Sequence, residues 1–168
     1  MAEAVSIAPA AARAMLAVTA FGDVAPVCDG LARVLGVAAP DGPRFAREGD
    51  VFLLRLAPTR FFVMAPDGNS LVERVSAALG GVASVTDQSD AWGVFAVSGA
   101  PAHEVLARVV PVDLTPRRFG PSSVALTRAG AMDVRLWKLY DAAFEIAVGR
   151  SMGADLEHAL YTAARAFS

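Results

Sequence analysis

Short runs of hydrophobic residues along the chain predict a series of β-strands. Runs rich in Phe, Val and Leu lie on both sides of Pro58–Arg60, which predicts an antiparallel hairpin within residues 51–66. Residues 1–13 lack periodicity and are expected to be an extended or mobile lead, and residues 36–50, rich in Gly and Pro, are expected to be a loop. Further strands are predicted at residues 14–21, 82–90, 91–99, 122–128, 132–139 and 142–148.

Hydrophobic positions three or four residues apart predict helices between these strands. The helices are expected at residues 24–35, 70–79, 100–110 and 152–167. Asp23 is expected to cap the first helix, and Ser70 and Glu73 have the spacing of a capping box for the second. Ser151 is expected to cap the last helix.

The order of these elements predicts the fold class. Strands and helices are mixed without strict alternation, which favours an α+β domain with a largely antiparallel sheet. The stretches "FFVMAPDGNSLVERVSAAL" and "FEIAVGRSMGADLEHALYTAA" are each an apolar strand, a Gly/Ser-containing loop and an amphipathic helix. We therefore expect a single domain of residues 1–168, made of two pseudo-repeats at about 14–81 and 82–168.

Composition adds an expectation about partners. Hydrophobic residues make up 55% of the 168 residues and the mean hydropathy is +0.45, which is high for a soluble monomer. No window approaches the ~20 apolar residues of a membrane helix, and no convincing signal peptide opens the chain, so we expect a cytoplasmic protein. The apolar excess indicates surface that is kept for another protein chain.

Charge and the scarce reactive side chains exclude several classes of function. The net charge is −2, and the local excess of seven basic over four acidic residues in 108–150 is far below a nucleic-acid footprint. Cys28 is the sole cysteine and is expected to be a small buried residue of the core. The two histidines lack the spacing of metal ligands. Asp87 and Asp90 read as turn residues. We therefore expect no catalytic residues and no metal site.

The segment "VVPVDLTPRRFGPSSVALTRAG" contains the adjacent Arg117 and Arg118. Three prolines stiffen it, and Asp113 and Thr115 can bond to nearby backbone. A stiff loop that displays arginines suits protein recognition or a fixed salt bridge better than an anionic ligand, because no Gly-rich cradle accompanies it.

From Val85 onwards the chain resembles the gamma subunit of heterotetrameric sarcosine oxidase. The resemblance rests on "VTDQSDAWGVFAVSGAPAHEVL", "PVDLTPRRF" followed by "SSVALT", "VRLW" and "FEIAVGRSMGADLEHAL". That family in turn resembles the first two-thirds of the glycine-cleavage T-protein, a folate-dependent aminomethyltransferase with a duplicated α+β unit. The resemblance implies an accessory subunit of a complex that oxidises sarcosine and passes the one-carbon unit to tetrahydrofolate.

The resemblance also sets expectations for sites and partners. It implies no cofactor in this chain, with FAD, FMN, NAD and tetrahydrofolate on partner subunits, and an alpha subunit as the direct partner beside beta and delta. Asp50 and Glu145 match acidic folate positions, but the Gly-Tyr-Thr-Gly-Glu pattern before the closing strand and the asparagine after the hairpin are lost, which argues against folate binding. The candidate interface residues are Arg117, Arg118, Phe119 and Trp137.

The sequence also fits two alternative functions. The chain is alternatively a free-standing folate-binding or aminomethyltransferase-like protein that uses Asp50 and Glu145. A third reading is a paralogue that has lost its complex and pairs with a second copy through its apolar face.

Overall fold

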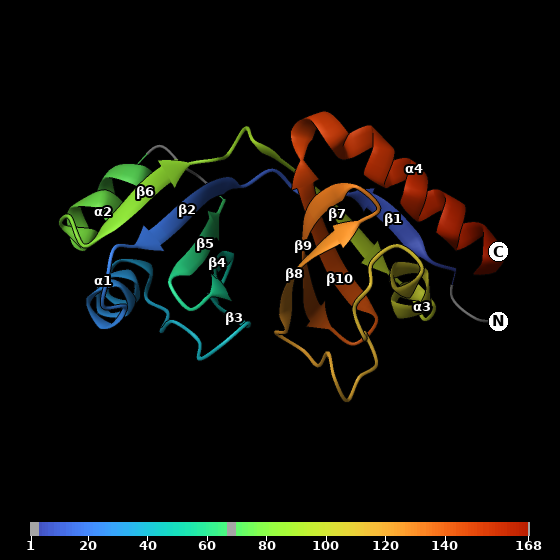
Figure 1. Ribbon diagram of the computed structural model, residues 1–168, viewed down its shortest axis with the longest axis horizontal. Coiled ribbons are helices and arrows are strands. Elements are labelled where there is room, and N and C mark those ends of the chain that lie inside the picture. The colour runs from blue at the N-terminus through green and yellow to red at the C-terminus, as the bar shows by residue number, and fades with distance from the viewer. Residues whose placement is uncertain (1–3, 67–69, 168) are drawn as a thin grey trace. The chain divides into compact units, whose positions relative to one another are not determined.

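The computed structural model describes residues 4–66 and 70–167 and has an α+β architecture (Figure 1). The chain divides into two compact units: unit 1 comprises Met1–Ala11 and Ala91–Ser168, and unit 2 comprises Ala12–Asp90. Each unit contains one five-stranded sheet, and every strand pair in the described part of the chain is antiparallel. The predicted fold class is therefore confirmed.

Unit 2 packs two helices on one face of its sheet. The sheet has the order β3-β4-β5-β2-β6, and α1 and α2 lie side by side (Figure 1). Gly30 of α1 lies so close to α2 that an added Cβ would be 2.8 Å from Leu79 Cδ2 and 3.1 Å from the Ala78 carbonyl oxygen. The elements are β2 (Ala14–Ala20), α1 (Ala25–Leu35), β3 (Phe45–Glu48), β4 (Val51–Ala57), β5 (Arg60–Ala65), α2 (Leu71–Leu79) and β6 (Ala83–Asp87).

Unit 1 is built in the same manner, with a sheet of order β1-β7-β10-β9-β8 and a core formed with α3 and α4. Its elements are β1 (Ser6–Pro9), β7 (Trp92–Ser98), α3 (Ala102–Ala107), β8 (Val124–Ala129), β9 (Met132–Tyr140), β10 (Ala143–Gly149), the 3₁₀ turn η1 (Arg150–Met152), α4 (Gly153–Ala164) and the 3₁₀ turn η2 (Arg165–Phe167). The core side of the sheet includes Phe95, Val97, Leu136, Phe144, Ile146 and Val148.

The two sheets correspond strand by strand, but their fifth strands are exchanged along the sequence. In unit 2, β6 follows α2 and pairs with β2; in unit 1, the matching position beside β7 is taken by β1 from the start of the chain. Each of the two edge strands thus directly precedes the first central strand of the other unit. This relation makes residues 1–11 part of unit 1 although 79 residues separate them from Ala91.

Several sequence expectations need correction. Residues 1–13 include β1, and the expected loop at 36–50 includes β3. The predicted strands within 82–90 and 91–99 both form, but they belong to different units.

The expected helix caps also differ in part. Neither Ser70 nor Ser151 makes a side-chain capping bond: Ser70 precedes α2 without one, and Ser151 lies inside η1. Asp23 does accept a hydrogen bond of 3.1 Å from Ala25 N at the start of α1, and Gly36 ends that helix in the left-handed conformation.

Candidate functional site

A buried carboxylate and an indole meet on the unit 1 sheet. Glu145 of β10 lies directly across from Trp137 of β9 in the strand register. Trp137 Nε1 donates a hydrogen bond of 2.9 Å to Glu145 Oε2, and both side chains are buried, at 0% and 3% exposed. Burying a polar group costs free energy unless the group is hydrogen-bonded, so this contact stabilises the buried carboxyl group.

An arginine and a second indole continue the same sheet face. Leu136 and Ile146 point to the helix-side core, so Trp137, Glu145 and Arg135 point to the opposite face. The guanidinium carbon of Arg135 lies 3.8 Å from the centre of the Trp92 ring, in cation–π geometry. Burial lowers the pKa of Arg135 to about 10, which still leaves the guanidinium charged at neutral pH.

This sheet face has polar groups that are already engaged within the chain. An acid beside an indole is a donor–acceptor set that a flat, nitrogen-rich ligand could use. Here, however, the carboxylate holds Trp137, and Arg135 stacks on Trp92. The arrangement therefore favours a structural role for Glu145 over a ligand-binding one.

The second acidic candidate, Asp50, lies in a different setting. It follows Gly49, which has a φ of +55°, in the turn between β3 and β4, and its side chain is exposed to solvent. Asp50 belongs to unit 2 and Glu145 to unit 1. Asp50 by itself has the surroundings of a turn residue.

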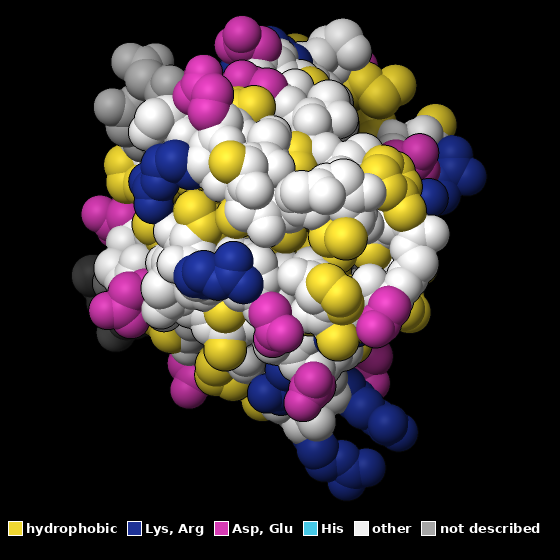
Figure 2. Space-filling view, turned by 90° about the vertical axis from the view of Figure 1, so that its left-hand side faces the viewer, with side chains coloured by type: hydrophobic (Ala, Val, Ile, Leu, Met, Phe, Trp, Pro, Cys, Tyr) yellow, Lys and Arg dark blue, Asp and Glu magenta, His cyan; other side chains and the backbone are white. Residues whose placement is uncertain are grey.

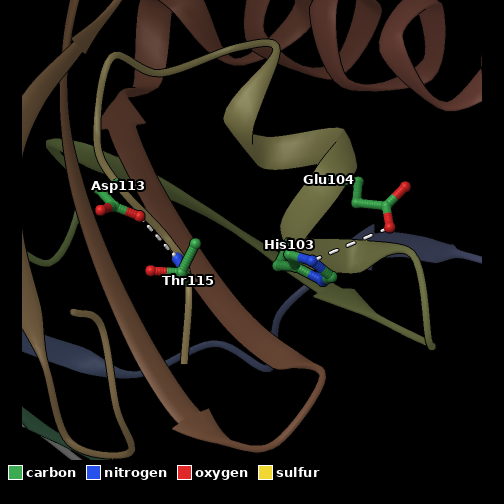
Figure 3. Close-up of polar contacts among 4 residues, drawn as sticks. All are labelled: His103, Glu104, Asp113 and Thr115. Carbon is green, nitrogen blue, oxygen red and sulfur yellow. Dashed lines mark hydrogen bonds and ion pairs between the residues drawn. The ribbon is translucent and has the colours of Figure 1, made fainter. Parts of the chain in front are cut away.

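The loop between α3 and β8, which carries Arg117 and Arg118, is held in place by core packing and by hydrogen bonds. Leu114 and Phe119 are buried in the unit 1 core, at 3% and 5% exposed, and Phe119 stacks on Phe144 with ring centres 6.5 Å apart. Asp113 Oδ1 accepts a hydrogen bond of 3.1 Å from Thr115 N (Figure 3). Hydrogen bonding from the Thr115 side chain, and then from its backbone N–H, lowers the pKa of Asp113 below its usual value, with a smaller contribution from the nearby arginines. The part of the loop from Asp113 to Phe119 is thus fixed on both sides of the two arginines.

The four expected interface residues divide into two exposed and two buried. Arg117 and Arg118 are exposed on the loop, whereas Phe119 and Trp137 are buried within the chain. A buried side chain offers no surface to another protein. Arg117 and Arg118 therefore remain the candidate interface residues.

The remaining reactive side chains form no cluster. Cys28 is half-buried in α1, and burial raises the pKa of its thiol, which disfavours the nucleophilic thiolate. His103 Nε2 lies 3.9 Å from Glu104 Oε1 on α3, and both side chains reach solvent (Figure 3). Among residues 4–66 and 70–167, no group of three His, Cys, Asp or Glu side chains has metal-binding geometry.

The pair Asp87–Asp90 is part of a turn. Asp87 Oδ1 accepts hydrogen bonds from Ser89 Oγ at 2.6 Å and Ser89 N at 2.9 Å. These bonds lower the pKa of Asp87. The side chain of Asp87 is therefore held by Ser89, two residues further along the chain.

The face of unit 2 that is seen in Figure 2 has no large basic area. In Figure 2, basic and acidic side chains are interspersed with small hydrophobic areas on this face. No helix in the described part of the chain is long and apolar enough to cross a membrane.

Comparison with known proteins defines the fold class first. No family model matches the sequence. The crystal structure of the glycine cleavage system aminomethyltransferase T from Bartonella henselae matches with a TM-score of 0.69 and 16% identity, over 94% of this chain and 45% of that chain. The chain thus has the fold of about half of an aminomethyltransferase chain.

The more specific likeness is to sarcosine oxidase gamma subunits. The chain is 35% identical over 111 residues to the gamma subunit from Arthrobacter sp, a match that covers 64% of this chain and 55% of that relative. The gamma subunit from Corynebacterium sp. (strain P-1) is 37% identical over 87 residues, which is 51% of this chain and 43% of the relative. These matches span about half the length of the relatives.

A solved complex contains a chain of the same fold. The heterotetrameric sarcosine oxidase from Corynebacterium sp. U-96, in complex with pyrrole 2-carboxylate, matches with a TM-score of 0.88 and 27% identity, over 98% of this chain and 85% of that chain. Together with the matches to the two gamma subunits, this match confirms the predicted resemblance to the gamma subunit of heterotetrameric sarcosine oxidase.

Proposed function

We propose that this chain is a non-catalytic accessory subunit of a heterotetrameric sarcosine oxidase. The observation that carries the proposal is the match along 98% of the chain to a component of such a complex. The apolar composition supports it, because an obligate subunit keeps hydrophobic surface for its partners and commonly buries ~2,000 Å² or more. The direct partner is the flavin-bearing alpha subunit, with beta and delta in the same cytoplasmic complex.

The chemistry in this proposal takes place on the partner chains. FAD, FMN, NAD and tetrahydrofolate are bound there, where sarcosine is oxidised and its one-carbon unit is transferred. Within this chain, Glu145 holds Trp137, and Asp50 is an exposed turn residue. Because neither candidate folate residue is arranged to bind a ligand, these contacts support a role of the chain in assembly of the complex.

Mixing experiments test association directly. The purified chain is sedimented alone and then with the flavin-bearing subunit from the same genome. The proposal predicts that the flavin absorbance moves with a species heavier than either component. A flavoprotein that sediments unchanged at micromolar concentrations of both would contradict the proposal, and self-association of this chain alone would favour the paralogue reading.

The alternative of a free-standing folate protein is favoured by the retention of a buried carboxylate at Glu145. Calorimetry with tetrahydrofolate separates the two functions. The accessory-subunit proposal predicts no heat of binding from the isolated chain. Binding that is lost in Asp50→Ala or Glu145→Gln would instead assign a folate site to this chain.

A further inference from the structure

Three exposed side chains of binding-competent types gather at one end of the unit 1 sheet. Tyr140, at the end of β9, is 63% exposed, and Arg117 and Arg118 are exposed on the loop that leads into β8. Two backbone hydrogen bonds tie this loop to β9: Ser122 N donates to the Lys138 carbonyl oxygen at 2.9 Å, and Lys138 N donates to that of Ser123 at 3.0 Å. Since Phe119 of the same loop stacks on Phe144 of β10, the loop that carries the arginines packs on the end of the sheet where β9 ends at Tyr140.

The support of the two arginines is rigid on both sides. Thr115 N is held by Asp113 before them (Figure 3), and Arg118 N and Phe119 N both donate to the Thr115 carbonyl oxygen, at 2.9 and 2.8 Å. Phe119, directly after them, is fixed in the core against Phe144. Because the backbone is already ordered, binding through these arginines loses little conformational freedom.

Neither arginine forms an ion pair within the described part of the chain. The ion pairs of Glu104, Asp133 and Asp141 are made with other residues and do not include Arg117 or Arg118. Asp113 interacts electrostatically with both arginines, and its Oδ1 accepts the hydrogen bond from Thr115 N. Two adjacent guanidinium groups are thus available to carboxylates from outside the chain.

A hollow adjoins Tyr140 at this end of the sheet. Its volume is about 400 Å³, and its lining includes Ser6, Ser98, Gly99, Tyr140 and Asp141. Half of the lining residues are polar (Ser6, Ser98, Tyr140 and Asp141), so the hollow suits a polar side chain of a partner. Tyr and Arg are the residue types most enriched among the residues that dominate binding energy in protein interfaces.

We propose that Arg117, Arg118 and Tyr140 form a docking surface for an acidic segment of a protein partner. This inference rests on the proposed function, under which the partner is the flavin-bearing subunit, and it adds the chemistry by which that partner is recognised. Protein carboxylates fit better than a nucleotide or phosphate, because the loop has no Gly-rich backbone cradle for phosphate oxygens.

The test compares two charge-reversal variants of the full chain. The first is Arg117→Glu with Arg118→Glu; the matched control is Arg33→Glu with Arg60→Glu, which makes the same charge change at exposed positions of unit 2. Affinity for the flavin-bearing subunit is measured by surface plasmon resonance at low and high NaCl. Unfolding midpoints of both variants show whether each is folded.

The docking surface predicts a selective loss in the first variant. Its affinity falls by about 100-fold or more at low salt and loses most of its salt dependence, while the control stays within about threefold of wild type. Arg117→Gln with Arg118→Gln and Tyr140→Ala each weaken binding by about tenfold; these milder variants give the answer if the double reversal does not fold.

Different failures overturn different statements. Wild-type binding with equal affinity in the folded arginine variants overturns the docking surface and leaves the proposed function intact. No wild-type binding overturns the proposed function and the docking surface with it. Binding of inorganic phosphate or tripolyphosphate to the wild-type chain at micromolar concentration, abolished by the glutamine pair, would assign an anion site and overturn the protein-docking inference.

Discussion

Trp137 and Glu145 lie opposite each other on β9 and β10, and their 2.9 Å hydrogen bond joins two side chains that are almost completely buried. The bond gives the carboxylate a partner inside the protein. A double-mutant cycle with Trp137→Phe and Glu145→Gln isolates this contact from the other effects of each substitution. We expect a coupling free energy of about 1–3 kcal/mol from urea unfolding. A coupling near zero would contradict the structural role of Glu145.

The loop residues Phe119 and Arg118 are expected to respond in opposite ways to truncation. Phe119→Ala opens a cavity beside Phe144 and is expected to lower the free energy of unfolding by about 3–5 kcal/mol. Arg118→Ala removes an exposed side chain and is expected to change it by no more than about 0.5 kcal/mol. Urea unfolding measures both, and similar losses from the two variants would show that the loop is not anchored as described.

The residues around the candidate site were predictable only in part from sequence. Trp137 and Glu145 are eight residues apart in two predicted strands, so a hairpin centred near residue 141 was a usable signal for their meeting. Arg135 and Trp92 meet because β7 and β10 pair across a long sequence separation, for which a single sequence has no local signal. Phe119 is adjacent to two exposed arginines, and its burial depends on core packing that sequence spacing does not report.

Some of the strands could be predicted from the sequence and others could not. The strong apolar runs at 51–65 and 142–148 formed the predicted strands. The missed strands β1, "SIAP", and β3, "FARE", are four-residue edge strands that contain proline or charged residues. Their strand character comes from partners: Ile7 pairs with Val97 and Phe45 with Leu54. Tertiary pairing decides such segments, and local propensity does not.

The carboxyl group of Asp87 predicts a pH effect with a defined sign. Its hydrogen bonds to Ser89 lower its pKa in the folded state below the ordinary value of 3.8. The stabilisation is therefore fully present above about pH 4 and is lost as the pH falls through the depressed folded-state pKa. An NMR titration of the Asp87 carboxyl carbon is expected to give a midpoint below 3.8, and Ser89→Ala is expected to raise that midpoint. A midpoint at or above 3.8 in the wild-type chain would show that the turn does not hold the carboxylate.

The matching strand orders lead us to propose that the chain is a duplicated unit, with pseudo-repeats at about 14–81 and 82–168 whose edge strands β1 and β6 are exchanged. Gly99 makes the exchange testable. Its φ is +109°, and an added Cβ would lie 2.7 Å from the Ala4 carbonyl oxygen. Gly99→Ala is expected to cost about 1–3 kcal/mol and to displace the chain around β1.

Hydrogen exchange locates the effect of Gly99→Ala. Faster exchange is expected in β1 and β7, with β2 and β6 unchanged, because the latter belong to unit 2. The matched control is Gly153→Ala in α4, where an added Cβ meets nothing within 4 Å, and it is expected to be stabilising by about 0.5–1 kcal/mol. Unchanged protection of β1 in the Gly99 variant would contradict its pairing with β7.

If this chain acts by joining a flavoprotein, as we propose, that flavoprotein purifies with it. The tagged chain is expressed together with the other subunits encoded beside it, and the visible spectrum and intact mass of the eluate are recorded. We predict a yellow complex whose mass includes one copy of this 17.4 kDa chain. A colourless eluate that contains this chain alone, from cells in which the other subunits are soluble, would contradict the claim.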